Sequence, residues 1–186
     1  MFKLSYNLYD LKNYPNWCVY RLFNNNSNKL SKLPFNPITH LPIKTNDSST
    51  WSTYDNCIKT LNEHSYDGIG FVFSTNDPYI GIDIDNINNK ELVKELITIL
   101  DSYTEYSPSR KGLHIICKYN KVNNLIGKKN NSLELEIYNY NRFFTITGDV
   151  YLDTIVKNKT EEIDRIIEKY FDSDMKKVLN EFLEKK

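Results

Sequence analysis

Two aspartates, Asp83 and Asp85, stand two residues apart in the segment YIGIDID at residues 79–85. Isoleucines alternate with them, which is the period-2 pattern of a β-strand with one buried face. Both carboxylates then leave the opposite face, roughly 7 Å apart at their Cα atoms. Such acids repel each other unless a positive charge lies between them, and oxygen ligands on a rigid strand suit Mg²⁺ or Mn²⁺. The pair indicates a divalent-metal site, with two solvated acids at a strand end as the alternative.

A second candidate site is the segment SPSRKGLH at residues 107–114, where Pro108 and Gly112 favour a sharp turn. The turn presents two hydroxyls, two cations and then His114 within a short space. Hydroxyls, cations and free backbone amides are the groups that bind polyphosphates. The segment is therefore a candidate phosphate site. A polar hairpin turn with His114 satisfied inside the sheet is the alternative.

A third candidate is LELEIY at residues 133–138, where Glu134 and Glu136 face the same way. A carboxylate on a neighbouring strand would complete a metal site begun by Asp83 and Asp85. Three acids on two strands can hold two divalent ions, which stabilise the attacking and leaving oxygens of a phosphoryl displacement. An EF-hand is excluded, because no Gly stands at loop position six and no Glu at position twelve. A glycosidase-type acid pair would leave the cationic, hydroxyl-rich turn unexplained.

The sequence between Tyr106 and Leu133 contains basic residues and no acid. With 24 basic and 24 acidic side chains the net charge is zero, so only a local patch can attract nucleic acid. This basic island is a candidate phosphate or nucleic-acid surface, and a solvated loop is the alternative. Its members are Arg110, Lys111, Lys118, Lys121, Lys128 and Lys129.

The chain of 186 residues is long enough for one domain with a short appendage. Its three cysteines are odd in number and far apart, which is typical of reduced, buried thiols in a cytoplasmic protein. No stretch has the length or apolarity of a signal peptide or a membrane span, so we expect no membrane partner. The three histidines lack zinc-ligand spacing.

The hydrophobic pattern predicts strands and helices in alternation. Strands are expected at 16–23, 68–74, 79–85, 112–119, 133–138 and 142–147, and the end of a strand followed by a turn is expected at 105–109. Helices are expected from Thr50 or Ser52 to Glu63, from Asn88 or Asn89 to Ser102, at 160–170 and at 173–185. The stretch from 32 to 42, rich in proline, is expected to be extended with little regular structure. Hairpin links, including one from 68–74 to 79–85, predict an α+β fold with a largely antiparallel sheet.

Taken in order, GIDID, SPSRKGLH and LEIYNYNRFFTITG resemble the motifs of the archaeo-eukaryotic primase superfamily. The resemblance is strongest to the primase-polymerase domain of phage and plasmid replication proteins. WCVYRL, KLPFNP, the Thr50-Trp51 pair and GIGFVF are similar to that domain's opening region, so the match covers roughly residues 15–150. It implies the primase-polymerase fold, with an RRM-like catalytic half, flanking helices and a C-terminal helical tail. The expected division is a catalytic domain at 1–158 and a tail or linker at 159–186.

The resemblance also implies roles for individual residues. The metal-binding acids are Asp83, Asp85 and Glu136, with Glu136 preferred to Glu134 because the match continues into RFFTITG. The triphosphate contacts are His114, Ser107, Ser109 and Lys111. Arg142 and Phe143 match a basic-aromatic pair beside the nucleotide, and Lys32 matches the lysine of the KxP segment. The sequence departs from the family at Gly112, where a serine two residues before the histidine is usual.

The activity that the resemblance implies is metal-dependent, template-directed nucleotidyl transfer, by a DNA primase or polymerase in phage, plasmid or mobile-element replication. It needs a pair of Mg²⁺ or Mn²⁺ ions, nucleoside triphosphates and a DNA template and primer, with a replicative helicase as a partner in cis or in trans. The basic island would follow the template, and Tyr138 or Tyr140 would stack on bases. The alternatives are a non-catalytic nucleotide- or DNA-binding module, a metal-dependent nuclease, and an interaction protein with acids only on its surface.

Overall fold

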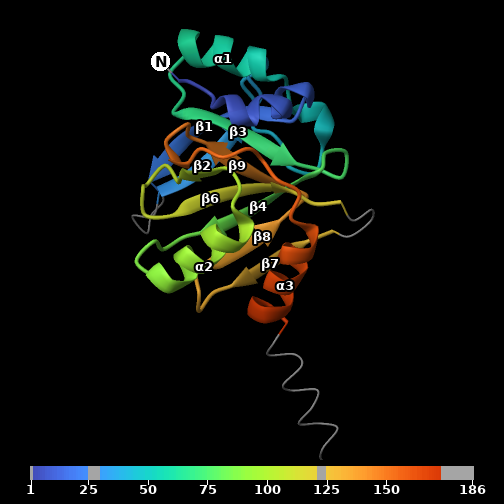
Figure 1. The fold of residues 1–186 in the computed structure, drawn as a ribbon. Coiled ribbons are helices and arrows are strands. Elements are labelled where there is room, and N and C mark those ends of the chain that lie inside the picture. Colours follow the sequence, from blue (N-terminus) through green and yellow to red (C-terminus); the bar gives the residue numbers. More distant parts are fainter. Residues whose placement is uncertain (1, 25–29, 121–124, 173–186) are drawn as a thin grey trace, which may run out of the picture.

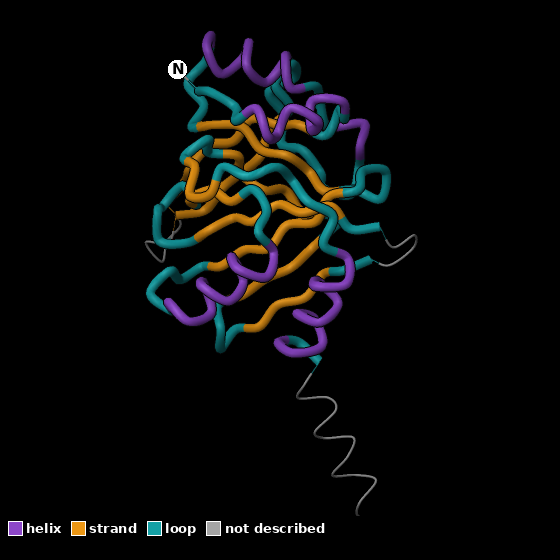
Figure 2. The backbone as a smooth tube through the Cα atoms, in the orientation of Figure 1, coloured by secondary structure: helices purple, strands orange, loops and turns teal. Residues whose placement is uncertain are grey.

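The computed structural model describes residues 2–24, 30–120 and 125–172. Its strands form two antiparallel sheets in the middle of the molecule, and helices lie on the outer sides (Figures 1 and 2). The predicted α+β class with largely antiparallel sheets is confirmed. The first sheet has the order β2-β1-β3-β9 and the second has the order β10-β5-β6-β4-β8-β7.

The strands of the four-stranded sheet are β1 Trp17–Asn24, β2 Leu30–Phe35, β3 Gly68–Phe73 and β9 Arg142–Ile146. Those of the six-stranded sheet are β4 Tyr79–Ile84, β5 Thr104–Tyr106, β6 Leu113–Lys118, β7 Gly127–Asn130, β8 Leu135–Tyr138 and β10 Val150–Leu152. Helices α1 Tyr54–Glu63, α2 Lys90–Leu100 and α3 Thr160–Tyr170 are accompanied by 3-10 helices η1 Tyr6–Asn13 and η2 Ser48–Thr50.

Strand β4 lies in the interior of the six-stranded sheet and separates an apolar face from a polar one. Ile80, Ile82 and Ile84 are fully buried in a core that this sheet shares with α2 and α3. The residues between them, Gly81 and Asp83, face the other way, as the alternation predicts. Helices α2 and α3 thus cover one face of the sheet and leave the acid-bearing face for the other layer (Figure 1).

A second core joins the two sheets to η1 and α1. Trp17, Phe71, Phe73 and Phe144 come from the four-stranded sheet, and Tyr79 comes from β4. The Phe144 and Phe73 rings leave room for no side chain at Gly81, because a Cβ there would lie 2.6 Å from each ring. The aromatic side chains therefore fix how closely the two sheets approach beside Asp83.

One expected connection is different in the structure. The predicted hairpin from 68–74 to 79–85 is wrong, because β3 pairs with β1 and β9 while β4 pairs with β6 and β8. The chain crosses between sheets at Asp77, whose carboxylate accepts hydrogen bonds from the backbone N–H groups of Ser74 and Tyr79 and from Asn16 Nδ2. Strands β8 and β9 are likewise adjacent in sequence but belong to different sheets.

Several elements were not predicted or begin elsewhere. The proline-rich stretch overlaps β2, an edge strand in which Pro34 is tolerated because no further strand needs its missing N–H. Strands β7 and β10 and helix η1 were also missed. Helix α1 is capped by Thr53 and not by Thr50 or Ser52, since the Ser52 backbone is paired with Trp17. Helix α2 begins after Asn89, as expected, but ends at Leu100 before left-handed Asp101.

Helix α3 packs on the six-stranded sheet through buried Ile163 and Ile166. It is part of the layer that carries β4, although the expected division placed it in the tail after residue 158. The last expected helix, at 173–185, lies outside the described residues.

All three cysteines are buried and free, as predicted. Within the described segments, no helix is both long and apolar enough to cross a membrane.

Candidate active site

A row of polar side chains crosses the six-stranded sheet from strand to strand. Asp83 on β4 stands opposite His114 on β6 and opposite Glu136 on β8. The row continues to Glu105 on β5, opposite His114, and to Lys129 on β7, opposite Glu136. Directly opposed residues of antiparallel strands have neighbouring side chains on the same face. The register therefore brings together three segments that are far apart in the sequence.

The middle of this row is largely shielded from solvent. The His114 side chain is 2% exposed, that of Glu136 13% and that of Asp83 17%. The Phe144 ring of the four-stranded sheet stacks on the imidazole with 4.6 Å between ring centroids. The row thus lies where the two sheets meet, with Asp83 and Glu136 toward the open side.

Burial dominates the electrostatics of Asp83. It raises the pKa of the carboxyl to about 6, with a further rise from Glu136, while Lys32 lowers it. Tyr138 Oη donates a hydrogen bond of 3.4 Å to Asp83 Oδ2. A like charge nearby and a raised pKa are the conditions that a bound cation relieves.

His114 is a neutral imidazole in this environment. Burial, and next the charge of Lys32, lower its pKa to about 3. Its Nδ1 lies 3.1 Å from the carbonyl oxygen of Thr145, so Nδ1 carries the proton and donates it there. Nε2 then faces Asp83 Oδ1 at 3.7 Å with a free lone pair.

Lys32 reaches the site from β2 of the other sheet. The side chain as a whole is exposed, yet desolvation lowers the pKa of its ammonium, and the charges of Asp83 and Asp85 act in the opposite direction. Its charge also lowers the pKa of His114. The KxP lysine therefore lies within electrostatic reach of the acids and the histidine.

Glu136 is held between two cations and lines a depression of about 310 Å³. Lys129 Nζ donates to Glu136 Oε1, and Arg142 Nη2 lies 4.0 Å from Oε2. The Arg142 guanidinium also lies over the Tyr138 ring, 5.2 Å from its centroid. Phe143, half-buried, points to the other side of β9 and contacts Tyr20. Arg142 is thus at the acid row, whereas Phe143 is not in contact with it.

Glu134 and Glu136 occupy different places. Strand β8 begins at Leu135, and Glu134 precedes it in the left-handed region at φ 51°. The expected alternation from 133 therefore fails, and the Glu134 carboxylate accepts a hydrogen bond from Asn86 Nδ2. Only Glu136 of these two stands opposite Asp83.

Asp85 stands one residue beyond the end of β4 and is exposed. Its N–H donates to the carbonyl of Glu134 at 2.9 Å. The expected pair of carboxylates on one strand face is therefore split, with Asp83 in the row and Asp85 at its edge. Asp85 lines an open depression of about 460 Å³ together with Asn86, Ile87, Asn88, Arg110, Lys111 and Glu134.

The turn between β5 and β6 explains why Gly112 replaces a serine. A Cβ at residue 112 would lie 2.4 Å from the carbonyl oxygen of Ile84, which cannot give way. Ser107 instead brings a hydroxyl to this place, since its Oγ accepts from the Gly112 N–H at 3.2 Å. Ser109 Oγ lies 3.2 Å from Ser107 Oγ and accepts from the Lys111 N–H. The turn holds two hydroxyls together beside the end of β4.

Most of the described side chains of the basic island are engaged in ion pairs, so they are less available to bind phosphate or nucleic acid than the sequence indicates. Lys118 pairs with Asp10 at 3.3 Å, Lys128 with Asp172 at 2.6 Å and Arg110 with Asp149 at 2.8 Å. Lys129 pairs with Glu136. Lys121 lies outside the described residues. Asp10, Asp149 and Asp172 come from distant parts of the chain, so a local sequence window could not reveal them, whereas Glu136 is only seven residues from Lys129.

The donor set agrees in chemistry with a hard divalent ion, because carboxylate oxygens are the ligands of Mg²⁺ and Mn²⁺. Within the ranges that the structure describes, no three His, Cys, Asp or Glu side chains are close enough together to hold a metal ion. For Asp83, Asp85 and Glu136 to hold one metal ion together, their side chains would have to turn toward one another.

Glu105 is the site residue that sequence reasoning missed. It is fully buried beside His114, with 3.9 Å between Oε1 and Nδ1. Glu105 precedes the SPSRKGLH turn, and no local sequence feature distinguishes it from an ordinary polar residue of a strand. Only the pairing of β5 with β6 places it beside the histidine.

Comparison with known proteins gives one informative similarity. No protein-family model matches the chain. It is 31% identical over 150 residues to the DNA primase-polymerase of Nitratiruptor phage NrS-1. The aligned region covers 76% of this chain and only 20% of the phage protein, so the chain spans about a fifth of its relative's length. The predicted resemblance is thus confirmed: most of this chain is a domain homologous to part of a phage DNA primase-polymerase.

Proposed function

We infer that this chain is the catalytic domain of a DNA primase-polymerase, which transfers nucleotides under the direction of a template and releases pyrophosphate. The observation that carries this inference is the row of Asp83, His114 and Glu136 on three adjacent strands. The motifs that supply these residues lie in a chain similar to a phage primase-polymerase. We place the activity in the replication of a phage, plasmid or mobile element.

The metal ligands that we propose are Asp83, Asp85 and Glu136, with Mg²⁺ or Mn²⁺ as the ions. Such ions, when bound, would lower the pKa of the attacking hydroxyl and balance the charge of the triphosphate. With a pKa of about 6, Asp83 is mostly ionised at neutral pH and available as a ligand. Glu136 must exchange its contact with Lys129 for the metal.

The cations and hydroxyls around the acids would bind the triphosphate. Lys32 brings a positive charge from the four-stranded sheet, and the 107–112 turn brings Ser107, Ser109 and Lys111. His114 is neutral in the free protein, and a phosphate beside Nε2 would raise its pKa because an anion favours the charged imidazole. Its proposed role is therefore to donate from Nε2 to a phosphate oxygen once the nucleotide is bound.

The template and primer would lie on the open side of the row. Arg142 and Tyr140 line the depression beside Glu136 and could contact the nucleotide or the primer end. Arg110, Lys118, Lys128 and Lys129 would have to release acidic partners to bind a DNA backbone. Because the chain spans a fifth of its relative, a helicase acting in cis or in trans remains part of the proposal.

The test is template-directed incorporation with Mg²⁺ or Mn²⁺, with and without a primer. We expect Asp83→Asn, Asp85→Asn and Glu136→Gln each to lose at least about 100-fold in activity, because each removes a charge that balances the metal. The matched control is Glu134→Gln, which removes a carboxylate two residues from Glu136 and should keep activity within about 3-fold.

Other outcomes would point to the alternatives. Degradation of the template by the wild type, lost in Asp83→Asn, would indicate a nuclease. Nucleotide or DNA binding without incorporation or degradation would indicate a non-catalytic module. Equal loss in Glu134→Gln and Glu136→Gln would contradict the assignment of the third ligand.

A further inference from the structure

Glu105 is a buried carboxylate between His114 and the end of β9. The residue is 0% exposed and lies on β5. Its Oε1 accepts from the Thr147 N–H at 2.8 Å, and its Oε2 accepts from the Gly148 N–H at 3.1 Å and from Tyr103 Oη at 3.1 Å. Burying a carboxylate is costly unless its oxygens are hydrogen-bonded, and here both are.

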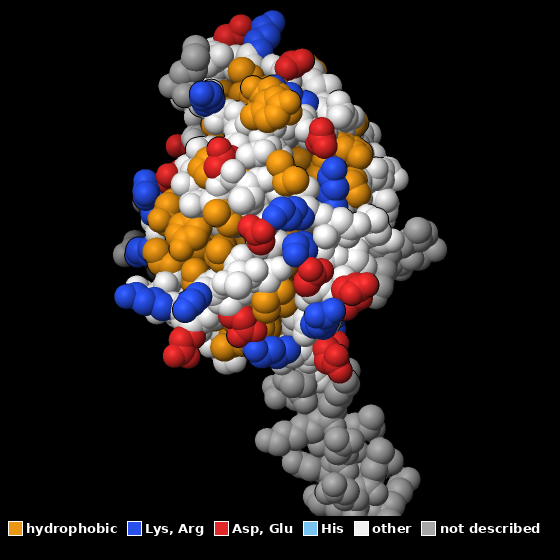
Figure 3. All heavy atoms as spheres, in the orientation of Figure 1, with side chains coloured by type: hydrophobic (Ala, Val, Ile, Leu, Met, Phe, Trp, Pro, Cys, Tyr) orange, Lys and Arg blue, Asp and Glu red, His pale blue; other side chains and the backbone are white. Residues whose placement is uncertain are grey.

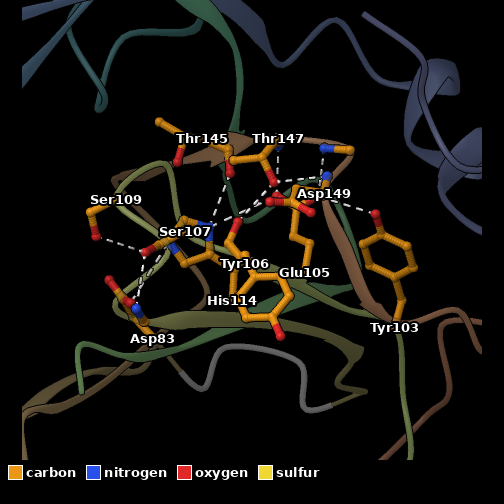
Figure 4. A network of polar contacts seen from close by, with 12 residues as sticks. Asp83, Tyr103, Glu105, Tyr106, Ser107, Ser109, His114, Thr145, Thr147 and Asp149 are labelled. Atoms are coloured by element: carbon orange, nitrogen blue, oxygen red, sulfur yellow. Dashed lines mark hydrogen bonds and ion pairs between the residues drawn. The ribbon is translucent and has the colours of Figure 1, made fainter. Parts of the chain in front are cut away.

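The segment that Glu105 binds comes from the other sheet. Residues 147 and 148 follow β9 of the four-stranded sheet, and β10 then joins the six-stranded sheet. Thr147 Oγ1 also donates to the Tyr106 carbonyl at 2.8 Å, and the Tyr106 N–H donates to the Asp149 carbonyl at 2.8 Å. These bonds attach the end of β9 to β5, with Glu105 as the side chain that reaches across (Figure 4).

The same segment fixes the His114 ring. The Thr145 carbonyl, two residues before Thr147, accepts the proton on Nδ1 at 3.1 Å. Glu105 Oε1 lies 3.9 Å from Nδ1, which is too far for a hydrogen bond but close enough to favour a proton there. With Nδ1 occupied, Nε2 points to Asp83, as Figure 4 shows.

We propose that Glu105 is the positioning residue of His114: its carboxylate holds the backbone at 147–148, the Thr145 carbonyl is thereby kept on Nδ1, and Nε2 is directed toward the space beside Asp83. The assignment of that space to a triphosphate depends on the proposed function, whereas the fixed ring and tautomer do not.

The remaining electrostatics agree with this role. Burial raises the pKa of Glu105 to about 7, although the N–H groups of Thr147 and Gly148 and the Tyr103 hydroxyl lower it. Hydrogen-bond donors therefore surround the carboxylate, although burial disfavours its charged form. If this position served only to fill space, an apolar side chain of similar volume would do so without the free-energy cost of burying a charge.

The direct test is ¹⁵N NMR of the histidine ring in protein labelled at histidine. There are three histidines, and the His114 signals are assigned by their loss in His114→Asn. We expect the Nδ1–H tautomer in the wild type at pH 7 and a substantial share of Nε2–H in Glu105→Gln, whose amide cannot accept both backbone N–H groups. The control is Tyr103→Phe, which removes one donor to Glu105 and leaves Thr145 and His114 untouched.

The kinetic test separates positioning from folding. Loss of folded protein lowers kcat and leaves KM unchanged, whereas a misdirected Nε2 raises the KM for the nucleotide. We expect Glu105→Gln to raise that KM by about 10-fold, in the range known for partners of functional histidines, with the KM for primer-template unchanged. Tyr103→Phe should leave both values near those of the wild type.

The Nε2–H tautomer in the wild type, or an unchanged tautomer in folded Glu105→Gln, would overturn the proposal. If Glu105→Gln does not fold, an Nε2–H tautomer in the wild type or in Tyr103→Phe still overturns the proposal, because it requires Nδ1–H in both. If the wild type incorporates no nucleotide, the function proposed above fails, while the NMR result still decides the role of Glu105.

Discussion

The pKa of Glu105 has a consequence for stability that can be measured without any substrate. An unfolded glutamate has a pKa near 4.3, and burial raises that of Glu105 to about 7. A carboxyl with a raised pKa binds more protons in the folded state, so its contribution is fully present below the unfolded value and is lost as pH rises toward 7. We expect the free energy of unfolding to fall by about 2 kcal/mol between pH 5 and pH 8 through this group alone.

Urea denaturation of wild type and Glu105→Gln at both pH values isolates this contribution. Asp77 and Asp83 also have pKa values raised to about 6, mainly by burial, and their titration is common to both proteins. The free energy of unfolding of the wild type should therefore fall more between pH 5 and pH 8 than that of Glu105→Gln. The same pH dependence in both would show that Glu105 titrates normally.

At the scale of elements, Gly81 controls the contact between β4 and the four-stranded sheet. An alanine Cβ would lie 2.6 Å from ring carbons of Phe144 and Phe73, so these buried rings, or the strands that carry them, must move. Overpacking of this kind costs about 1–3 kcal/mol, and we expect Gly81→Ala to lower the free energy of unfolding by that amount. Because Phe144 also stacks on His114, we expect activity to fall with it.

Gly127→Ala is the matched control for this measurement. It too places a methyl group on a strand of the six-stranded sheet, but the new Cβ would lie 3.5 Å from the Tyr140 ring, at ordinary contact distance. Its effect in urea denaturation should stay within about 0.5 kcal/mol. Equal destabilisation by both changes would show that the loss of glycine on a strand, and not the aromatic contact, is responsible.

The sequence predicts the elements better than their partners. The alternation of isoleucines with Gly81 and Asp83 correctly indicated a strand with one apolar face, because that pattern is local. The hairpin from β3 to β4 was wrong, because the choice of sheet depends on aromatic packing between distant strands. Strand β7 was missed for a similar reason: its Lys128 and Lys129 resemble a loop until Asp172 and Glu136 are placed beside them.

In the candidate site, too, local motifs could be predicted from the sequence and long-range contacts could not. The motifs nominated Asp83, His114 and Glu136, and the register of three strands brings them to one row. The alternation alone could not separate Glu134 from Glu136, because only the left-handed backbone at Glu134 breaks it, and the preference for Glu136 came from the resemblance. Glu105 and most of the acidic partners of the basic island depend on contacts between segments more than 30 residues apart, such as Thr147 with Glu105 and Lys118 with Asp10.

At the scale of the whole molecule, neutral charge limits what DNA can gain from the protein's field. Basic and acidic side chains are intermixed on the face seen in Figure 3, and the net charge is zero. Long-range attraction of a polyanion is therefore weak. The proposed DNA binding would depend instead on local contacts at the row, where Lys32 of one sheet meets the acids and histidine of the other.

A nucleotide bound at this place would join the two sheets and stabilise the whole chain. At 100 times its Kd, a ligand specific to the folded state adds about 2.7 kcal/mol, which corresponds to a rise in Tm of about 5–10 °C for a chain of this size. We expect that rise for wild type with Mn²⁺ and a deoxynucleoside triphosphate together. Lys32→Ala should lose most of it, because the contribution of the four-stranded sheet to the triphosphate is removed.

Lys59→Ala on α1 removes the same charge from an exposed position on the outer side and should respond like wild type. An equal reduction in both lysine variants would mean that net charge, and not the position of Lys32, governs binding. No stabilisation of the wild type by the ligands, even at millimolar concentration, would favour the interaction-protein alternative, because a specific site must stabilise by mass action. Stabilisation by Mn²⁺ alone, with no further rise on adding nucleotide, would instead agree with a nuclease, which has no need of a triphosphate.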